Sequence, residues 1–262
     1  MHAIVNIALK AARDAAEVLA QNSDRLDRVR VVQESEQGVI TNMDMDAEKT
    51  LIFHLQKAYP DYSIQSRVSG FIEGKDTNNV WVIDPLCGSS NYRRGIAHFC
   101  VSVALATAGK VQHGVLVNPM LREEFSASRG KGGQVNTQRL RVSKQSTLEN
   151  GVATLHGNPQ DEAQAKRLLA LQQALYGLPC TVHLTGCAPL DLAWNAAGRS
   201  DAGWLNTNAA TEESLAAALL ILQESGALIG DAQGSPDISK AKEVVFGNPK
   251  CFKQMLQLRK SC

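Results

Sequence analysis

Apolar residues recur every three or four positions at the start of the chain, as they do along one face of a helix. Ile4, Ala8, Ala11 and Ala15 follow this spacing, so residues 2–21 are predicted to form an amphipathic helix. The same criterion predicts further helices over residues 46–58, 160–177, 189–198, 212–225 and 249–258. Pro60 follows the second of these helices and is expected to end it.

Short runs rich in β-branched and aromatic residues predict strands in the middle of the chain. They cover residues 80–84, 99–107, 112–118 and 123–128, with turns that contain Gly or Pro between them. Residues 29–32, 38–41, 180–184 and 243–246 are also predicted to be extended. A helix pair, a sheet and then alternating strands and helices indicate an α/β fold of stacked layers. The weak pattern near residues 146–150 suggests an N-terminal α+β half, 1–146, and a C-terminal α/β half, 147–262.

The composition is that of an ordinary soluble protein. The chain has 262 residues, of which 44% are hydrophobic and 20% charged, and a formal net charge of +1. This charge gives no overall electrostatic reason to bind a membrane or a nucleic acid. No apolar run approaches the roughly 20 residues that span a bilayer, so we expect a cytoplasmic protein. The six cysteines form no CxxC pair, and reduced thiols are expected.

The most informative motif is an apolar strand that ends in an acid and a tight polar turn. Residues 81–92 read Trp-Val-Ile-Asp-Pro-Leu-Cys-Gly-Ser-Ser-Asn-Tyr. A strand that delivers Asp84 into a Gly-Ser-Ser turn is typical of the wall of a metal or phosphate site. The spacing resembles the Asp-Pro-Leu-Asp-Gly-Thr-Thr-Asn-Phe signature of the inositol monophosphatase family, whose members are Mg²⁺-dependent sugar-phosphate phosphatases.

The resemblance continues along the chain in the order of the family. Residues 40–48 match a Val-Thr-x-x-Asp-x-x-x-Glu element, residues 125–133 match a hairpin, and residues 185–201 match the substrate-side helix. Within the family, the chain is most similar to the bacterial SuhB-type branch. The resemblance implies a layered αβαβα sandwich, a homodimer, and a role in ribosomal-RNA antitermination through Nus factors and RNA polymerase.

Several positions that hold the family's metal ligands are substituted here. The family pattern uses six carboxylates, of which this chain keeps Asp44 and Asp84; the backbone carbonyl of Leu86 also corresponds to a family ligand. The other four positions fall on Arg67, Val68, Cys87 and Ser214. Mg²⁺ prefers oxygen ligands, Arg stays protonated, and a thiolate favours softer ions. The sequence therefore predicts weak or absent Mg²⁺ binding and no cofactor, with Mg²⁺ needed only if activity remains.

The residues that remain can be interpreted in two ways. Asp44 and Ser89 correspond to the pair that orients the attacking water, yet each can serve a purely structural role. Arg67 can bind a phosphate or sulfate, or it can pair with Asp84 or Asp44 and fill the cage. Glu213 is either a shifted ligand or an acid favoured at a helix N-terminus. The candidate substrate or anion-binding residues are Arg67, Gly88, Ser89, Ser90, Gly186 and Ala188.

Two functions of different classes follow. The first is a SuhB-like protein that has lost Mg²⁺-dependent phosphatase activity and acts by binding. The second is an inositol-1-monophosphatase, or a related sugar-phosphate phosphatase, whose residual activity uses Asp44, Asp84, Ser89 and Glu213. Six basic residues also either form a patch or lie scattered on solvated faces: Arg25, Arg28, Arg30, Arg139, Arg141 and Lys144.

Overall fold

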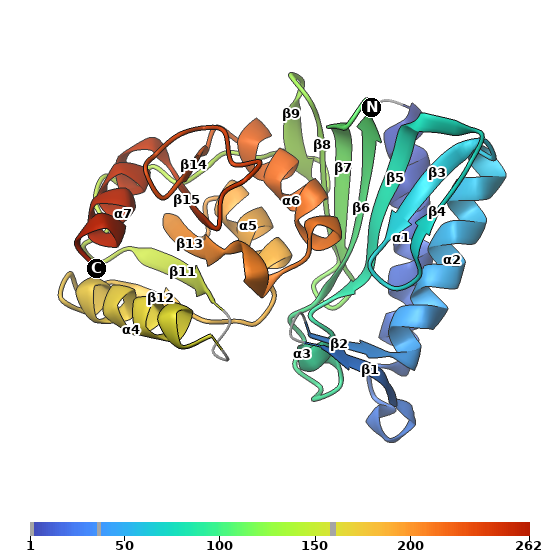
Figure 1. Ribbon diagram of the computed structural model, residues 1–262, viewed down its shortest axis with the longest axis horizontal. Coiled ribbons are helices and arrows are strands. Elements are labelled where there is room, and N and C mark those ends of the chain that lie inside the picture. The colour runs from blue at the N-terminus through green and yellow to red at the C-terminus, as the bar shows by residue number, and fades with distance from the viewer. Residues whose placement is uncertain (1–2, 36–37, 158–160) are drawn as a thin grey trace.

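Three layers of helices alternate with two layers of sheet in this computed structural model, which describes residues 3–35, 38–157 and 161–262. Figure 1 shows α1 and α2 outside the larger sheet, α5 and α6 between the sheets, and α4 and α7 outside the smaller sheet. The predicted αβαβα sandwich is therefore confirmed. The helices are α1 (Ala3–Asn22), α2 (Asn42–Ala58), α4 (Glu162–Tyr176), α5 (Ala188–Ala196), α6 (Glu212–Glu224) and α7 (Pro249–Ser261).

The larger sheet has eight strands in the order β10-β9-β8-β7-β6-β5-β3-β4. Neighbouring strands run antiparallel except β3 and β5, which are parallel. The strands are β3 (Tyr62–Ser66), β4 (Gly70–Ile72), β5 (Asp76–Cys87), β6 (Cys100–Thr107), β7 (Lys110–Asn118), β8 (Glu123–Ser128), β9 (Gly132–Val135) and β10 (Gln138–Arg139).

The smaller sheet has five strands in the order β12-β11-β13-β15-β14. They are β11 (Val152–His156), β12 (Thr181–His183), β13 (Ala202–Asn206), β14 (Leu228–Asp231) and β15 (Glu243–Gly247). The chain passes from the larger to the smaller sheet between residues 139 and 152. Helices α5 and α6 share one apolar core with strands of both sheets, so this core includes residues from both predicted halves. The division into 1–146 and 147–262 stays a prediction.

Each boundary between layers is filled by an apolar core. The first core joins α1 and α2 to the larger sheet, around Leu51, Trp81 and Val103. The second surrounds α5 and α6 and reaches both sheets, and the third joins α4 and α7 to the smaller sheet around Trp204. No helix in the described parts of the chain is long and apolar enough to cross a membrane.

A small hairpin and two short 3-10 turns lie outside the two main sheets. The hairpin consists of β1 (Val31–Ser35) and β2 (Gly38–Thr41), and it lies beside α3 (Ser89–Tyr92) in Figure 1. The 3-10 turns are η1 (Leu26–Arg28) and η2 (Thr207–Ala209). Residues 2 and 160, where two of the predicted helices begin, lie outside the described residues.

The second helix begins earlier than the apolar pattern predicts, at Asn42 instead of residue 46. Its start is set by polar groups, which a search for apolar spacing overlooks. Thr41 is the N-cap, and its hydroxyl accepts a hydrogen bond from the Asp44 N–H. The Asp44 carboxylate in turn accepts from the Thr41 N–H at 2.8 Å, which completes a capping box. This arrangement fixes Asp44 in the first turn of α2.

Candidate functional site

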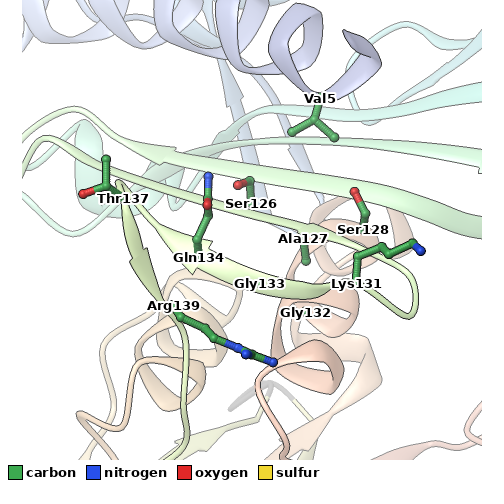
Figure 2. A pocket seen from close by; sticks show the side chains of 10 residues that line it. All are labelled: Val5, Ser126, Ala127, Ser128, Lys131, Gly132, Gly133, Gln134, Thr137 and Arg139. Atoms are coloured by element: carbon green, nitrogen blue, oxygen red, sulfur yellow. The ribbon is translucent and has the colours of Figure 1, made fainter. Parts of the chain in front are cut away.

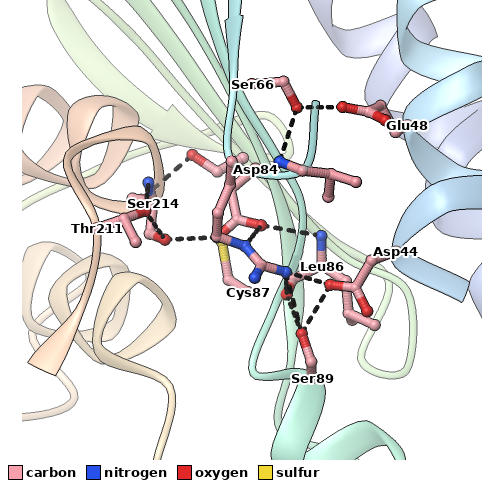
Figure 3. Close-up of polar contacts among 12 residues, drawn as sticks. Asp44, Glu48, Ser66, Asp84, Leu86, Cys87, Ser89, Thr211 and Ser214 are labelled. Atoms are coloured by element: carbon pink, nitrogen blue, oxygen red, sulfur yellow. Dashed lines mark hydrogen bonds and ion pairs between the residues drawn. The ribbon is translucent and has the colours of Figure 1, made fainter. Parts of the chain in front are cut away.

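The Arg67 guanidinium lies between the two retained carboxylates. Its Nε donates to Asp84 Oδ1 at 2.7 Å, and its Nη2 donates to Asp44 Oδ1. Nη2 is also 3.1 Å from Ser89 Oγ and 3.3 Å from the Leu86 carbonyl oxygen. Asp44, Asp84 and Ser89 come close together at one point of the fold (Figure 3). The structure thus agrees with the internal-pair interpretation of Arg67.

Four different elements bring this cluster together. Asp44 comes from the first turn of α2 and Asp84 from β5, while Ser89 begins α3. Arg67 follows β3, which pairs with β5 so that Ser66 lies opposite Ile83. The Arg67 N–H continues the ladder by donating to the Ile83 carbonyl at 3.1 Å. Strand register therefore places the arginine beside Asp84.

Glu48 holds the turn that carries Arg67, a role that the sequence motif alone did not reveal. This buried carboxylate accepts hydrogen bonds from the Ser66 hydroxyl and from the backbone N–H and hydroxyl of Ser69, the latter two at 3.0 and 2.8 Å. Figure 3 shows the contact between Glu48 and Ser66. Since Arg67 lies between these two serines in the chain, α2 fixes the position of the turn.

The charges in the cluster stabilise one another. Burial alone would lower the pKa of Arg67, but the Asp84 and Asp44 carboxylates outweigh it and raise that pKa above its ordinary value. The arginine therefore stays charged. Burial raises the pKa of Asp44, although Arg67 and the Thr41 and Ser89 hydroxyls oppose the shift.

Ser214 also pairs with Asp84. Its hydroxyl donates to Asp84 Oδ2 at 2.5 Å from the first turn of α6, where Thr211 is the N-cap. Asp84 Oδ1 accepts from Arg67 and from the Leu86 N–H. Both oxygens of this buried carboxylate are thus occupied by groups of the protein itself (Figure 3).

Cys87 faces an apolar core and is not activated for chemistry. It lies opposite Cys100 in the β5–β6 ladder, and the Cys187 Sγ is 3.4 Å from its carbonyl oxygen. Desolvation by burial raises the pKa of the Cys87 thiol, and so does the neighbouring Asp84 carboxylate. A neutral buried thiol is a poor nucleophile, so Cys87 is not expected to take part in catalysis.

The candidate anion-binding residues all line one cavity of about 220 Å³. These residues are Arg67, Gly88, Ser89, Ser90, Gly186 and Ala188. Asp84, Leu86, Cys87 and Ser214 line it as well, and so do Gly38 and Val39 of the β1–β2 hairpin. The structure therefore brings together most of the residues that the sequence singled out, and Asp44 contacts two of them.

Val68 and Glu213 do not belong to this cavity. Glu213 instead accepts a hydrogen bond from the Gln65 amide at 2.8 Å and borders a separate hollow beneath η2 and the start of β15. Because the Glu213 carboxylate is held outside the Arg67 cavity, its position supports the interpretation as an acid favoured at a helix N-terminus, and not as a shifted metal ligand. The loop residues 207–210 between β13 and α6 carry no acid.

A larger hollow of about 620 Å³ lies elsewhere, over β8 and β9 near the start of α1 (Figure 2). Val5, Ser128, Lys131 and Arg139 are among its lining residues. It contains none of the predicted site residues. Arg139 belongs to β10 and lines this hollow, whereas Arg28 belongs to η1, which contributes no residue to it. Of the six basic residues, the hollow therefore gathers Arg139 alone.

The residues present do not fit a magnesium site. Within the described ranges, no group of three or more His, Cys, Asp or Glu residues is arranged to hold a metal ion. The retained carboxylates of Asp44 and Asp84 are both bound to Arg67. Mg²⁺ also needs hard oxygen ligands, and Cys87 and Val68 supply none from their side chains.

Comparisons with known proteins agree over the full length of the chain. The profile of the Inositol monophosphatase family matches residues 1–262. The protein named Nus factor SuhB is 40% identical in Pseudomonas aeruginosa, over 98% of this chain and 95% of the relative. The protein of that name in Escherichia coli K12 is 36% identical over 98% and 95%.

Solved structures give the same answer for the fold. Extragenic suppressor protein suhB of Bartonella henselae superposes with a TM-score of 0.92 at 30% identity and covers 99% of both chains. The Thermotoga maritima IMPase superposes with a TM-score of 0.85 at 24% identity, over 99% of this chain and 98% of that one. From its matched sequence, its layers and these relatives, the chain belongs to the inositol monophosphatase family.

Proposed function

We propose that this protein acts by binding, in a Nus-factor role in transcription antitermination, and has lost Mg²⁺-dependent phosphatase activity. The observation that carries the second part is the Arg67 guanidinium bonded to both Asp44 and Asp84. The name Nus factor, which the SuhB relatives bear, supports the first part. The expected partners are other Nus factors and RNA polymerase, and we propose a cytoplasmic homodimer as the acting form.

Electrostatics explains why the arginine and a magnesium ion exclude each other. Two unit charges 4 Å apart interact by about 4 kcal/mol at the effective dielectric constant typical of protein sites, and a divalent ion doubles this value. Mg²⁺ beside Asp44 and Asp84 would face that repulsion from Arg67. It would also have to displace two charge-assisted hydrogen bonds. Val68, Cys87 and Ser214 supply no carboxylate that could offset this repulsion.

A phosphatase assay with purified protein tests the loss of activity. We expect no hydrolysis of inositol monophosphate above the blank at millimolar Mg²⁺ or Mn²⁺. The combined variant Arg67→Glu, Val68→Glu, Cys87→Asp and Ser214→Asp puts acids back at the four substituted positions and should gain metal-dependent turnover. Adding Asp84→Asn to that variant should abolish the gain. Metal-dependent turnover by the unaltered protein that Asp84→Asn removes would refute the proposed loss.

The binding role needs its own test. Transcription reactions with purified RNA polymerase and Nus factors should terminate less when this protein is added. Asp84→Asn should act as well as the unaltered protein, because the role does not depend on catalysis. If neither protein changes termination, and neither retains Nus factors or polymerase in a pull-down, the Nus-factor part of the proposal is wrong whatever the assay for phosphatase shows.

Residual phosphatase activity is the alternative, and one observation favours it. Ser89 Oγ lies 2.8 Å from Asp44 Oδ1, so the pair that matches the family's water-orienting residues is still hydrogen-bonded. The same serine also donates toward the Leu86 carbonyl at 2.9 Å, a contact that a purely structural serine would make. Turnover that requires Mg²⁺ or Mn²⁺ and is lost in Ser89→Ala would support this alternative.

A further inference from the structure

A mostly apolar groove runs along α6 on the side away from the Arg67 cluster. It has a volume of about 620 Å³ and extends from the turn at Gly109 to the loop between β14 and β15. We call it the α6 groove. Its apolar lining comes from Val111, Ala216, Leu219, Leu220, Ala227, Leu228, Ile229, Pro236 and Ile238. Leu228, at 40% exposure, stays open to solvent at its rim.

Two cations stand at one end of this groove. Lys110 begins β7, and Arg129 follows β8. The Arg129 N–H donates to the Gln112 carbonyl at 2.9 Å, so Arg129 lies beside the same end of β7. Within the part of the chain that the structure describes, the Lys110 ammonium makes no hydrogen bond or ion pair. Arg129 uses its Nε on the Val111 carbonyl at 2.7 Å and reaches only Gln223 with Nη1.

The carboxylate lining the groove does not neutralise these cations. Asp237 accepts hydrogen bonds from the hydroxyl and the N–H of Ser239, at 2.7 and 3.1 Å. It sits in the loop at the opposite wall, which Figure 1 shows passing beside α6. The groove thus combines an apolar channel with a positively charged end, which is complementary to a ligand that has an apolar chain and an anionic head.

The shape of the groove favours a thin chain over a peptide helix. Ile238 and Ser239 also line a second hollow farther along α6, as do Ala216 and Leu219. The loop therefore contacts α6 where the two hollows meet. A single hydrocarbon chain is much thinner than a helix about 10–12 Å across and needs less room between this loop and α6. The volume lies in the range of pockets for small ligands, roughly 300–1,000 Å³.

We propose that the α6 groove binds a free long-chain carboxylate, with the hydrocarbon chain along α6 and the carboxylate at Lys110 and Arg129. The inference is independent of the proposed function, because the groove lies outside the Arg67 cavity and involves none of its residues. Burying each added methylene is worth about 0.8 kcal/mol. Affinity should therefore rise up to about fourfold per methylene until the channel is full.

Calorimetric titration of the full-length protein with octanoate, decanoate and dodecanoate, each below its micelle concentration, tests this proposal. We expect one site per chain and an affinity that rises steeply with chain length. Lys110→Glu should weaken dodecanoate binding at least tenfold, while Lys131→Glu, at an exposed lysine of the hollow in Figure 2, should leave it unchanged. Dodecyltrimethylammonium, with the opposite head charge, should bind far more weakly than dodecanoate.

Other outcomes would overturn the proposal. An affinity that does not depend on chain length would indicate non-specific adsorption. Equal weakening of dodecanoate binding by Lys110→Glu and Lys131→Glu would indicate the same. No binding of dodecanoate to the unaltered protein would reject the site outright. Competition of dodecanoate by an acidic amphipathic peptide that itself binds more tightly would assign the groove to a protein partner instead. The variant Ala216→Phe, once circular dichroism shows that it is folded, should have a narrower channel. Its affinity should therefore stop rising at a shorter carboxylate than that of the unaltered protein.

Discussion

At the residue scale, Arg67 links the two carboxylates of the candidate site. The sequence pattern predicts a family carboxylate at this position, and Arg67 instead forms ion pairs with Asp44 and Asp84. Its side chain is only 11% exposed, so water screens these pairs little. We attribute the proposed loss of activity chiefly to this residue, because its fixed charge compensates the two acids.

The first prediction concerns the stability that Arg67 supplies. Arg67→Ala would leave two buried carboxylates without a compensating positive charge, which typically costs about 3–5 kcal/mol. We expect a loss of this size in the free energy of unfolding, measured by urea denaturation at neutral pH. Added Mn²⁺ should recover part of it, because the vacated carboxylates can then hold a cation.

A matched control is available on the surface. Arg13 pairs with Glu124, but its side chain is 52% exposed, and exposed pairs contribute about 0–1 kcal/mol. Arg13→Ala should therefore change the free energy of unfolding by no more than this amount. Equal losses in the two variants would show that the Arg67 pairs are not worth more than a surface contact.

At the element scale, polar groups fix the ends of helices that apolar spacing locates only approximately. Helix α2 starts four residues earlier than the apolar pattern predicts because Thr41 and Asp44 cap it. Strands β11 and β13 were not predicted either. Both are buried, short and paired in parallel, so their side chains do not alternate between apolar and polar, and a period-two pattern cannot reveal them.

The second prediction tests the N-cap of α2. Thr41→Ala removes the hydroxyl that accepts from the Asp44 N–H and donates to Asp44 Oδ2 at 2.6 Å. Loss of an N-cap costs about 0.5–2 kcal/mol. Thermal and urea unfolding should show a loss in this range for Thr41→Ala and a smaller one for Thr41→Ser, which keeps the hydroxyl. Equal losses would mean that the methyl group, not the cap, carries the effect.

The third prediction concerns pH and the buried Asp191 of α5. Burial raises the pKa of this carboxyl, but contacts with His156 and His98 at 3.0 and 2.9 Å, and with the Thr185 hydroxyl, lower it well below its ordinary value. His156 Nε2 lies close to Asp191 without hydrogen-bond geometry. Because the pKa of Asp191 is lowered in the folded state, its ionised carboxylate stabilises the fold at pH values above the unfolded-state pKa of about 3.9. This stabilisation is lost progressively as the pH falls below that value towards the folded-state pKa.

Urea denaturation across pH checks this sign. The unaltered protein should be more stable than Asp191→Asn at neutral pH, and the difference should shrink as the pH drops below about 4. Asp61, an exposed residue whose carboxylate lies 3.4 Å from the Lys75 ammonium, provides a control, since Asp61→Asn should change the pH profile little. A difference that grows on acidification would contradict the assigned direction.

At the scale of the whole molecule, the order of elements and the motifs determine the fold. The sandwich could be predicted because many matched segments occur in the family's order. The chemistry of the candidate site could be predicted only in part. Residue types at Arg67 and Cys87 excluded Mg²⁺-type ligands, but the simultaneous contact of Arg67 with Asp44 and Asp84 depends on the β3–β5 register and the α2 cap. Local sequence carries no direct sign of the register, whereas the cap follows the Thr-x-x-Asp pattern of a capping box at Thr41 and Asp44.

Binding of Mn²⁺ distinguishes a site closed by Arg67 from a functioning metal site. Electron paramagnetic resonance of Mn²⁺ mixed with the protein distinguishes free from bound ion. We predict only free Mn²⁺ with the unaltered protein, and bound Mn²⁺ with the variant that carries Arg67→Glu, Val68→Glu, Cys87→Asp and Ser214→Asp. One or more equivalents of Mn²⁺ bound tightly by the unaltered protein, and released by Asp84→Asn, would contradict the account.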